Sequence, residues 1–197
     1  MANEIEAKIK IRTFEPVLSA LREAGAEFIG EHEEIDQYYD ARGGKLRRRD
    51  CGLRVRTIRT PKRPTAVRWS EARDVDTSQA MLPLLTYKGP RKAGGRLKVR
   101  LEVQTRLADA PAMGRILEEL GYSPTLIVRK KRCRYRLMGC NVELDELRGI
   151  GRFVEIEGPS ERAVNKAVRA LHVAGEPTVE SYISMVANWR KRQQRNR

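Results

Sequence analysis

The chain has 197 residues, which suits one domain or one domain with a small appendage. Hydrophobic residues make up 40% and charged residues 34%, so a core can form beneath an unusually large polar surface. The formal net charge of +14 favours a polyanionic partner, whereas 6% aromatic residues are too few for a protein that binds nucleic acid mainly by stacking.

Alternating charged and apolar residues open the chain. One parity carries Glu4, Glu6 and Lys8 and the other is aliphatic, which predicts a strand with one charged and one apolar face. Apolar spacing then predicts a helix over 14–25, and a second strand follows over 27–40. The early half of that second strand is charged on both parities, so its pattern is weak.

The middle of the chain contains three predicted strands and one long connection. Strands are expected at about 51–59, 84–88 and 98–104, because each shows a period of two. Residues 60–83 contain three prolines and no clear periodicity, which predicts a loop or excursion. The arginine run at 47–49 is interpreted as part of a solvated loop.

The last third of the chain alternates helices with strands. Strands are predicted at about 125–137, 140–147 and 152–158. Helices are predicted over 109–120 and 160–173, with Asp109 and Ser160 as N-caps, and a final helix runs from about Val179 into a basic tail. About eight mostly sequence-adjacent strands and three or four helices predict an α+β fold whose antiparallel strands can close a barrel.

In strand after strand the polar parity carries full charges rather than Ser or Thr. Two interpretations are open: an ordinary sheet with a charged, wet outer face, or an inverted barrel with aliphatic side chains outside and charges lining a hydrated lumen. Confined charges lose solvation, so a charged lumen is favourable only if a polyanion and its metal ions complete the pairing. Carboxylates two residues apart place oxygen donors ~7 Å apart on one strand face, which suits Mg²⁺ or Mn²⁺.

Seven ordered motifs resemble those of the CYTH superfamily, the triphosphate tunnel metalloenzymes. The resemblance spans residues 2 to about 186 and so implies one tunnel domain, with residues 187–197 as a basic tail. The motifs are Glu4-x-Glu6-x-Lys8, Tyr38-Tyr39-Asp40, Leu53-Arg54-Val55-Arg56, Thr86-Tyr87-Lys88-Gly89-Pro90 with Arg100-Leu101-Glu102, Lys130-Lys131-Arg132, Val142-Glu143-Leu144-Asp145 and Phe153-Val154-Glu155-Ile156-Glu157.

The resemblance implies an eight-stranded antiparallel barrel around a polar tunnel, with helices packed outside. It also implies metal ligands for Mg²⁺ or Mn²⁺: Glu4, Glu6, Glu102, Asp145, Glu155 and Glu157. The implied phosphate-binding residues are Lys8, Arg54, Arg56, Lys88, Arg100, Lys130 and Arg132. By the same resemblance Glu4, Glu6 and Lys8 are expected to be the catalytic residues.

The resemblance also implies an activity on a triphosphate. Tyr-Lys-Gly-Pro at 87–90 and Ser181-Tyr182-Ile183 are most similar to the class IV adenylate cyclase branch, which converts ATP to cyclic AMP and pyrophosphate. Other branches with a similar tunnel hydrolyse inorganic tripolyphosphate or thiamine triphosphate. The stretch 57–85 is longer than the hairpin expected there, and we interpret it as an insertion that could cover one tunnel mouth.

A rival hypothesis is a non-catalytic polyphosphate or nucleic-acid binder, which the positive charge and basic tail favour. The carboxylate set distinguishes the two, because a pure polyanion binder gains nothing from acids that face its arginines. Three cysteines without CxxC spacing, no signal segment and no run of ~18 apolar residues predict a cytoplasmic protein without a membrane segment. The apolar residues of the last helix allow either a homodimer or core packing.

Overall fold

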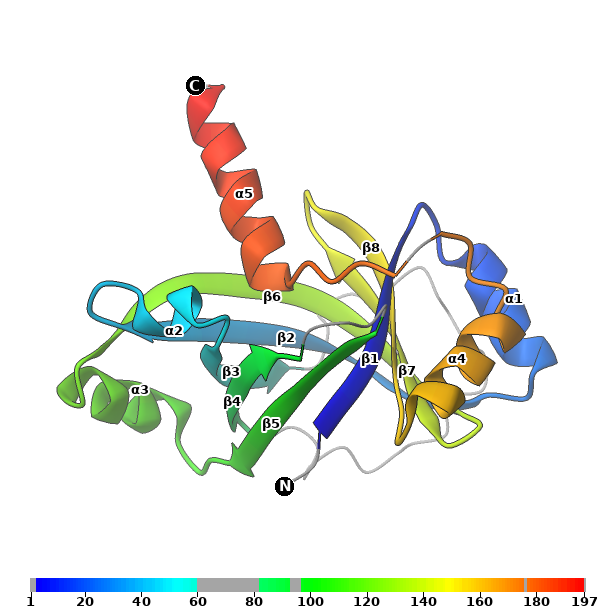
Figure 1. Cartoon of the computed structure of the whole chain (residues 1–197), viewed down its shortest axis with the longest axis horizontal. Helices are drawn as coiled ribbons and strands as arrows, with labels where there is room; N and C mark the ends of the chain where they lie inside the picture. The colour runs from blue at the N-terminus through cyan, green and yellow to red at the C-terminus, as the bar shows by residue number, and fades with distance from the viewer. Residues whose placement is uncertain (1–2, 60–81, 93–96, 176, 197) are drawn as a thin grey trace.

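The computed structural model describes residues 3–59, 82–92, 97–175 and 177–196, and most of them belong to a barrel with helices outside it (Figure 1). The strands are β1 (Asn3–Ile11), β2 (Glu27–Ala41), β3 (Gly52–Arg59), β4 (Leu84–Arg91), β5 (Lys98–Arg106), β6 (Tyr122–Leu137), β7 (Cys140–Leu147) and β8 (Gly151–Glu157). The helices among the described residues are α1 (Glu15–Glu23), α2 (Lys45–Arg48), α3 (Ala110–Glu119), α4 (Glu161–Ala170) and α5 (Tyr182–Arg195).

The eight strands close completely, in the order β1-β5-β4-β3-β2-β6-β7-β8, and every neighbouring pair is antiparallel. The seam is β1, whose first half pairs with β5 from Asn3↔Leu101 and whose second half pairs with β8 as far as Ile11↔Arg152. The second half of β1 does not pair with β5, so one of its edges is free of strand partners. Residues before α5 cover that edge, since the Thr178 amide donates a hydrogen bond to the Lys8 carbonyl. The predicted α+β barrel is therefore confirmed.

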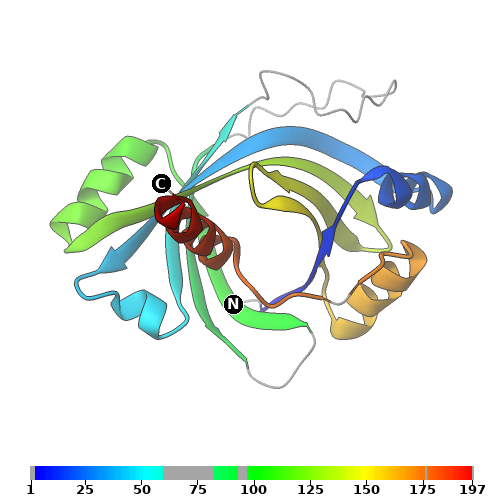
Figure 2. The same ribbon diagram turned by 90° about the horizontal axis from the view of Figure 1, so that it is seen from above.

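The apolar core lies outside the barrel, between the strands and the helices. Helices α1 and α4 pack on the outer surface of β1 and β6 to β8, where Leu21 and Val164 belong to one cluster with Val142 and Ile156 (Figure 2). Helix α3 covers another part of the wall through Leu117. The aliphatic parity thus faces outward, and the interpretation as an ordinary sheet with a charged outer face is wrong.

Helices α3 and α4 begin at the side-chain caps that were expected. The carboxylate of Asp109 accepts a hydrogen bond from the amide of Ala112, and Ser160 accepts one from Ala163, as the sequence predicted for both caps. Such caps satisfy amides that have no partner within the first turn. Among the described helices, none combines the length and apolar character that a membrane crossing requires.

Three boundaries differ from those expected. Residues 57–59 and 84–85 belong to β3 and β4, and residues 60–81 of the predicted insertion lie outside the described part of the chain. The arginine run overlaps the one-turn helix α2, because Asp40 accepts hydrogen bonds from the amides of Leu46 and Arg47. The basic tail is the continuation of α5, which ends only at Arg195.

Candidate active site: a charged tunnel through the barrel

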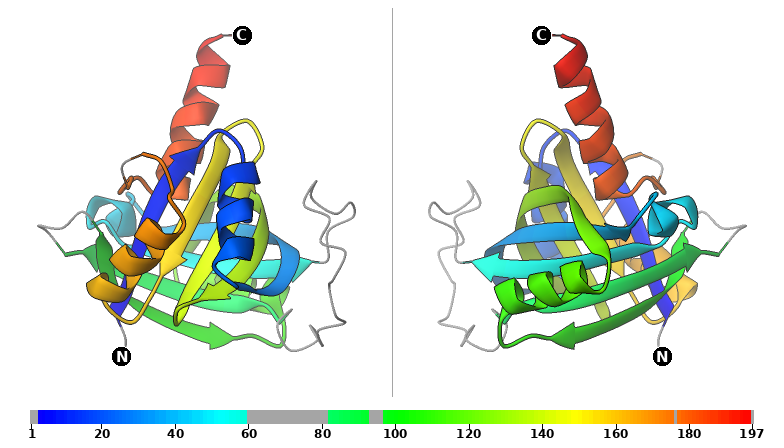
Figure 3. Two further views of the ribbon diagram at one scale, coloured as in Figure 1. Left: turned by 90° about the vertical axis from the view of Figure 1, so that its right-hand side faces the viewer. Right: turned by 90° about the vertical axis from the view of Figure 1, so that its left-hand side faces the viewer.

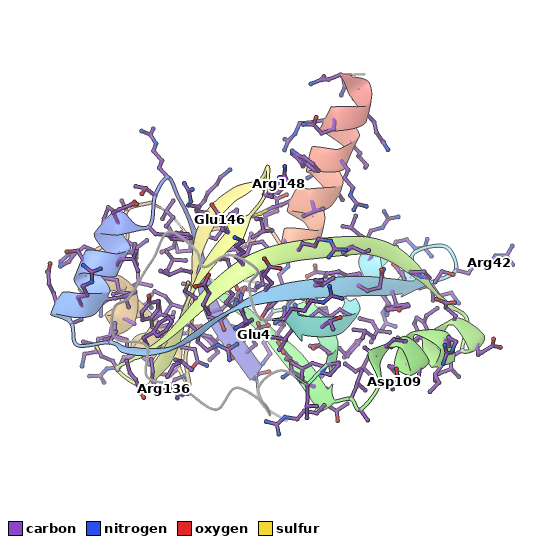
Figure 4. All side chains as sticks on the ribbon, turned by 180° about the vertical axis from the view of Figure 1, so that it is seen from behind. Glu4, Arg42, Asp109, Arg136, Glu146 and Arg148 are labelled. Atoms are coloured by element: carbon purple, nitrogen blue, oxygen red, sulfur yellow. The ribbon has the colours of Figure 1, made fainter. Side chains whose placement is uncertain are left out.

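The barrel encloses a cavity of about 880 Å³ that all eight strands line. The interior parity of each strand supplies the lining, so the charged residues that alternate along the sequence converge here. Figure 4 shows Glu4 near the middle of the molecule, among the strands, whereas Arg136 and Arg148 lie nearer its periphery. Twelve of the thirteen predicted site residues line the cavity: Glu4, Glu6, Lys8, Arg54, Arg56, Lys88, Arg100, Glu102, Lys130, Arg132, Glu155 and Glu157.

One wall of the cavity is rich in carboxylates from β1, β5 and β8. The Lys88 ammonium lies between two of them, 2.5 Å from Glu4 Oε1 and 2.7 Å from Glu102 Oε2. Burial tends to raise the pKa of Glu4, but Lys88 outweighs it and holds the pKa below its ordinary value. The second oxygen, Glu4 Oε2, is buried and has no hydrogen-bond partner among the described residues, which leaves one anionic atom there without compensation.

Glu157 lies at the same wall. Burial, together with the neighbouring charges of Glu143, Glu4 and Glu102, raises its pKa to about 7. Several carboxylates therefore compete for few cations at this wall. A divalent cation, which prefers oxygen ligands, would relieve that repulsion.

The opposite wall contains the arginines of β3, held by a carboxylate that the sequence analysis did not include. Asp36 Oδ1 accepts from Arg56 Nε at 2.6 Å, and Asp36 Oδ2 accepts from Arg56 Nη2 at 2.8 Å and Arg54 Nη1 at 3.0 Å. Burial tends to raise the pKa of Asp36, but these two guanidinium groups hold it below its ordinary value. Asp36 therefore fixes both side chains of the Arg-x-Arg motif.

Glu34 performs the same role for the cations of β6. Its carboxylate lies 2.9 Å from Arg56 Nη1, 3.1 Å from Lys130 Nζ and 3.0 Å from His32 Nε2. Burial is again opposed by the surrounding cations, which hold the pKa of Glu34 well below its ordinary value. Glu34 and Asp36 are almost completely buried, at 1% and 2% exposure, so Glu34 neutralises cations within the cavity lining and Asp36 does so from beneath it.

Asp145 differs from the other predicted metal ligands. It is fully buried, and its oxygens accept hydrogen bonds from Lys130 at 3.0 Å, from Arg132 twice at 2.6 Å, and from the Tyr182 hydroxyl at 2.8 Å. These donors occupy the carboxylate, which is the one predicted site residue outside the cavity lining. In this arrangement Asp145 orients cations, and its role as a metal ligand stays a prediction.

Helix α5 brings Tyr182 to one end of the cavity. The Lys8 ammonium lies 3.9 Å from the centre of the Tyr182 ring and 3.1 Å from Glu155. Below this contact, Tyr182 packs edge-on against Phe153, and Met185 belongs to the same apolar cluster. The apolar residues at the start of α5 therefore pack inside their own chain.

Two guanidinium groups retain buried donors toward the cavity. Arg54 Nε and Arg100 Nε are buried without a hydrogen-bond partner, and the only ion pair that Arg100 forms within the described residues is with Asp50, at 4.0 Å. Arginine donates to phosphate oxygens in a planar fork, so an unpaired Nε is a natural phosphate contact. Both residues were predicted to bind phosphate.

The sequence analysis missed Glu34, Asp36 and Tyr182 as parts of the site. The signal for the first two was present, because Glu34, Asp36 and Tyr38 share one parity. The charged opposite parity concealed it. Lys98 begins the strand predicted at about 98–104 but was not assigned to the site, and its ammonium lies 2.6 Å from Glu6 Oε1.

The donor set fits a hard divalent cation. Glu4, Glu6, Glu102 and Glu157 offer carboxylate oxygens, and the unpaired Glu4 Oε2 together with the raised pKa of Glu157 marks a deficit of positive charge. Within the described part of the chain, no three such side chains are already arranged as a metal site. Lys88 accounts for this, since its ammonium stands between two of the four carboxylates.

Comparisons with known proteins match this architecture. The CYTH domain model matches residues 2–182. A protein of Methanocaldococcus jannaschii described as a "putative adenylate cyclase" is 28% identical over 154 residues, which are 78% of this chain and 75% of that protein. A structure from Vibrio parahaemolyticus with the same description has a TM-score of 0.74 and 20% identity, and the match covers 94% of this chain and 98% of that one. A cyclase-like protein from Hippeastrum, described as having a dominant triphosphatase activity, has a TM-score of 0.64 and 18% identity over 95% of each chain.

Proposed function

Because the chain belongs to the CYTH domain family, we propose that it is a metal-dependent enzyme that processes a triphosphate inside the barrel. The observation that carries this proposal is that buried groups of both signs lack partners among the described residues of the cavity. Glu4 has an unpaired carboxylate oxygen, and Arg54 and Arg100 have unpaired guanidinium donors. A triphosphate with its metal ion would supply the missing partners of both.

Glu4, Glu6, Glu102 and Glu157 are the residues that would hold Mg²⁺ or Mn²⁺, with Glu155 close by. When bound, such an ion would polarise a phosphoryl oxygen and neutralise charge that develops during the reaction. Lys88 contacts both Glu4 and Glu102, so these carboxylates would have to exchange its ammonium for the ion. The Lys88 ammonium would then be free to donate to a phosphate oxygen.

The phosphate groups would be held by cations that are already oriented. Arg54 and Arg56 are fixed by Asp36, and Lys130 and Arg132 by Asp145, so little side-chain entropy is lost when a phosphate binds. Their carboxylate partners remain behind them and keep each guanidinium in place. Substrate binding thus adds contacts to a preformed cradle.

Lys8 is better suited to stabilise charge than to remove a proton. Burial tends to lower its pKa, but Glu155 and Glu6 reverse that effect and hold the pKa above its ordinary value. The group therefore stays an ammonium at neutral pH and donates to phosphate oxygens. A proton released by the attacking oxygen must pass to water or to a carboxylate such as Glu6.

Two reactions use this arrangement. In a hydrolase, water attacks the terminal phosphorus; in a cyclase, the ribose 3′-hydroxyl attacks the α-phosphorus and pyrophosphate leaves. The relative from Methanocaldococcus jannaschii favours the class IV adenylate cyclase reaction on ATP. Hydrolysis of ATP, inorganic tripolyphosphate or thiamine triphosphate is the alternative, and the products distinguish these reactions.

The test is to incubate the protein with ATP, tripolyphosphate and thiamine triphosphate, each with Mg²⁺, Mn²⁺ or EDTA, and to resolve the products. We expect metal-dependent release of phosphate or pyrophosphate, with cyclic AMP if the enzyme is a cyclase. Glu4→Gln should lower kcat by two orders of magnitude or more while the protein stays folded, because Lys88 keeps Glu102 as a partner at 2.7 Å. No turnover on any of the three substrates would refute the proposal.

The matched control is Glu146→Gln. Glu146 is also a strand carboxylate paired with an arginine, at 3.0 Å from Arg152, but this pair is half-exposed on the outside of the barrel. Full activity of Glu146→Gln shows that losing one carboxylate does not by itself reduce turnover. If Glu4→Gln and Glu146→Gln are equally active, the metal assignment is wrong.

A further inference from the structure

Most of the positive charge of the molecule lies outside the tunnel. Twelve cationic and nine acidic side chains line the cavity, an excess of only three, whereas the whole chain carries +14. The tunnel therefore accounts for about a fifth of the net charge, and a triphosphate substrate does not explain the rest. A charge of this size on an exterior attracts polyanions.

The second half of α5 concentrates this exterior charge on a projecting element. The first half of α5 is anchored by Tyr182, Met185 and Val186, and the helix then leaves the barrel, as Figure 3 shows from two sides. Residues 190–196 are exposed. They contain four cations and no acid: Arg190, Lys191, Arg192 and Arg195.

These cations do not lie on the face of the helix that packs against the barrel. At 100° per residue, Lys191 and Arg195 lie on the side opposite the anchoring residues. Arg190 and Arg192 lie on the two flanks, and Gln193 and Asn196 continue the anchoring side. Lys191 and Arg195 are four residues apart, where like charges destabilise a helix by a few tenths of a kcal/mol. Favourable interaction with the helix dipole is limited to the last turn and so does not explain Arg190 and Lys191.

The composition of this segment selects among polyanions. It has no apolar face after Trp189, which itself packs on Gly149, so insertion into a membrane surface has no hydrophobic component. It also lacks a free aromatic platform for unpaired bases. Cations with interspersed Gln and Asn side chains suit the phosphate backbone and groove edges of a duplex, whose major groove admits an α-helix.

We propose that residues 190–196 of α5 are a docking surface for the phosphate backbone of a nucleic-acid duplex. This surface is separate from the tunnel, and the inference does not depend on the reaction that the tunnel performs. Contacts to phosphate are independent of sequence, so the surface binds duplexes by charge and shape.

The test measures binding of a fluorescein-labelled 24-base-pair duplex, as RNA and as DNA, by anisotropy between 50 and 300 mM salt. The variant Lys191→Glu/Arg192→Glu/Arg195→Glu should bind at least tenfold more weakly at 100 mM salt. Its slope of log affinity against log salt should fall by about 2 to 3, since each lost phosphate contact removes about 0.9. Turnover of small triphosphates and the unfolding midpoint should stay unchanged.

The matched control is Arg162→Glu/Lys166→Glu/Arg169→Glu on α4, which reverses three exposed cations on one helix face and changes the net charge equally. It should keep the affinity of the native protein within about threefold. Equal weakening by both variants would mean that net charge alone attracts the duplex, and the proposal fails. It also fails if the α5 variant binds normally, or if vesicles of anionic lipid bind α5 while the duplex does not.

Discussion

At the scale of single residues, the neighbours of each carboxylate in the site set its protonation state. Glu34 and Asp36 are buried and bonded to cations that hold their pKa values below the ordinary ones, so they remain ionised. Glu157 has no cation as a direct partner in the described structure and shares its wall with other carboxylates, so its pKa is raised to about 7. The same residue type thus serves two purposes, and its neighbours decide which.

Glu157 predicts a pH dependence of the metal-free protein. Its folded pKa of about 7 lies above the unfolded value near 4.5, so the native state binds the proton more tightly. This contribution to stability is complete below pH 4.5 and is lost as the pH rises to about 7. Glu157→Gln should therefore stabilise the protein at pH 8 in EDTA by about 1–2 kcal/mol, after allowance for screening at this partly exposed site.

Thermal unfolding between pH 5 and pH 8 measures this effect. The control is Glu119→Gln, an exposed acid of α3, which should leave the pH profile unchanged. Saturating Mg²⁺ should erase the advantage of Glu157→Gln at pH 8, because the ion then compensates the native carboxylate. An equal midpoint for native protein and variant at pH 8 in EDTA would contradict the assignment.

The substitution Asp36→Asn, which replaces a single heavy atom, should cause a large loss of stability. Asp36→Asn keeps the shape but leaves the guanidinium groups of Arg54 and Arg56 without their buried counter-charge. Breaking a buried ion pair on one side costs about 3–5 kcal/mol. We expect the free energy of unfolding to fall by about that amount in urea titrations, with weaker triphosphate binding in whatever fraction stays folded.

The comparison for Asp36→Asn is Glu146→Gln, whose pair with Arg152 is half-exposed. Exposed pairs contribute about 0–1 kcal/mol, so this variant should unfold close to the native midpoint. If both variants lose the same stability, Asp36 is no more than a surface partner of its arginines.

At the scale of the elements, the sequence was sufficient where periodicity is clean. Alternation in β1, β7 and β8 predicted both the strands and their charged faces, and the caps of α3 and α4 were predicted from Asp109 and Ser160. The first half of β2 has charges on both parities, so local pattern could not say that Glu34 and Asp36 face inward. Only pairing with distant strands, Asp36↔Arg56 and Glu34↔Lys130, decides it.

The position of Tyr182 also could not be predicted from local sequence pattern. A tyrosine at the start of a helix is ordinary in sequence, and its place beside Asp145 and Lys8 depends on contacts across 37 positions or more. The contact of Lys88 with Glu4 spans 84 positions. Local patterns predict elements, whereas partners of buried charges follow from the closed barrel.

The turn between β7 and β8 contacts α5 and should help to anchor it on the barrel. Gly149 has φ +76°, and an added Cβ would lie 3.0 Å from Cζ2 of Trp189. Gly149→Ala therefore combines a strained left-handed backbone, at about 1–2 kcal/mol, with displacement of the Trp189 ring. We expect a lower unfolding midpoint and a red-shifted tryptophan emission, as the ring becomes more exposed to water.

Gly139 offers a matched control, because its φ is also +76° but no atom lies within 4 Å of an added Cβ. Gly139→Ala should show the backbone penalty without the change in emission. If the two variants have the same emission spectrum, Trp189 does not anchor α5 on this turn.

At the scale of the whole molecule, the charges inside the barrel are paired and those outside repel. Salt screens exposed charges over about 10 Å at 0.1 M and reaches buried pairs much less. Raising NaCl from 50 to 300 mM should therefore raise the unfolding midpoint, although ion pairs are numerous. The α4 variant described above, with a much lower net charge, should respond less steeply; a falling midpoint in the native protein would show that exposed ion pairs dominate.

The seam of the barrel has a consequence for synthesis. Of the eight strands β1 is made first, and it pairs only with β5 and β8. At roughly 5–20 residues per second, β5 is complete about 5 to 20 seconds after β1, and β8 about 8 to 30 seconds after it. Until β5 is made, both edges of β1 lack a partner strand, so the newly made strand is a candidate for chaperone binding.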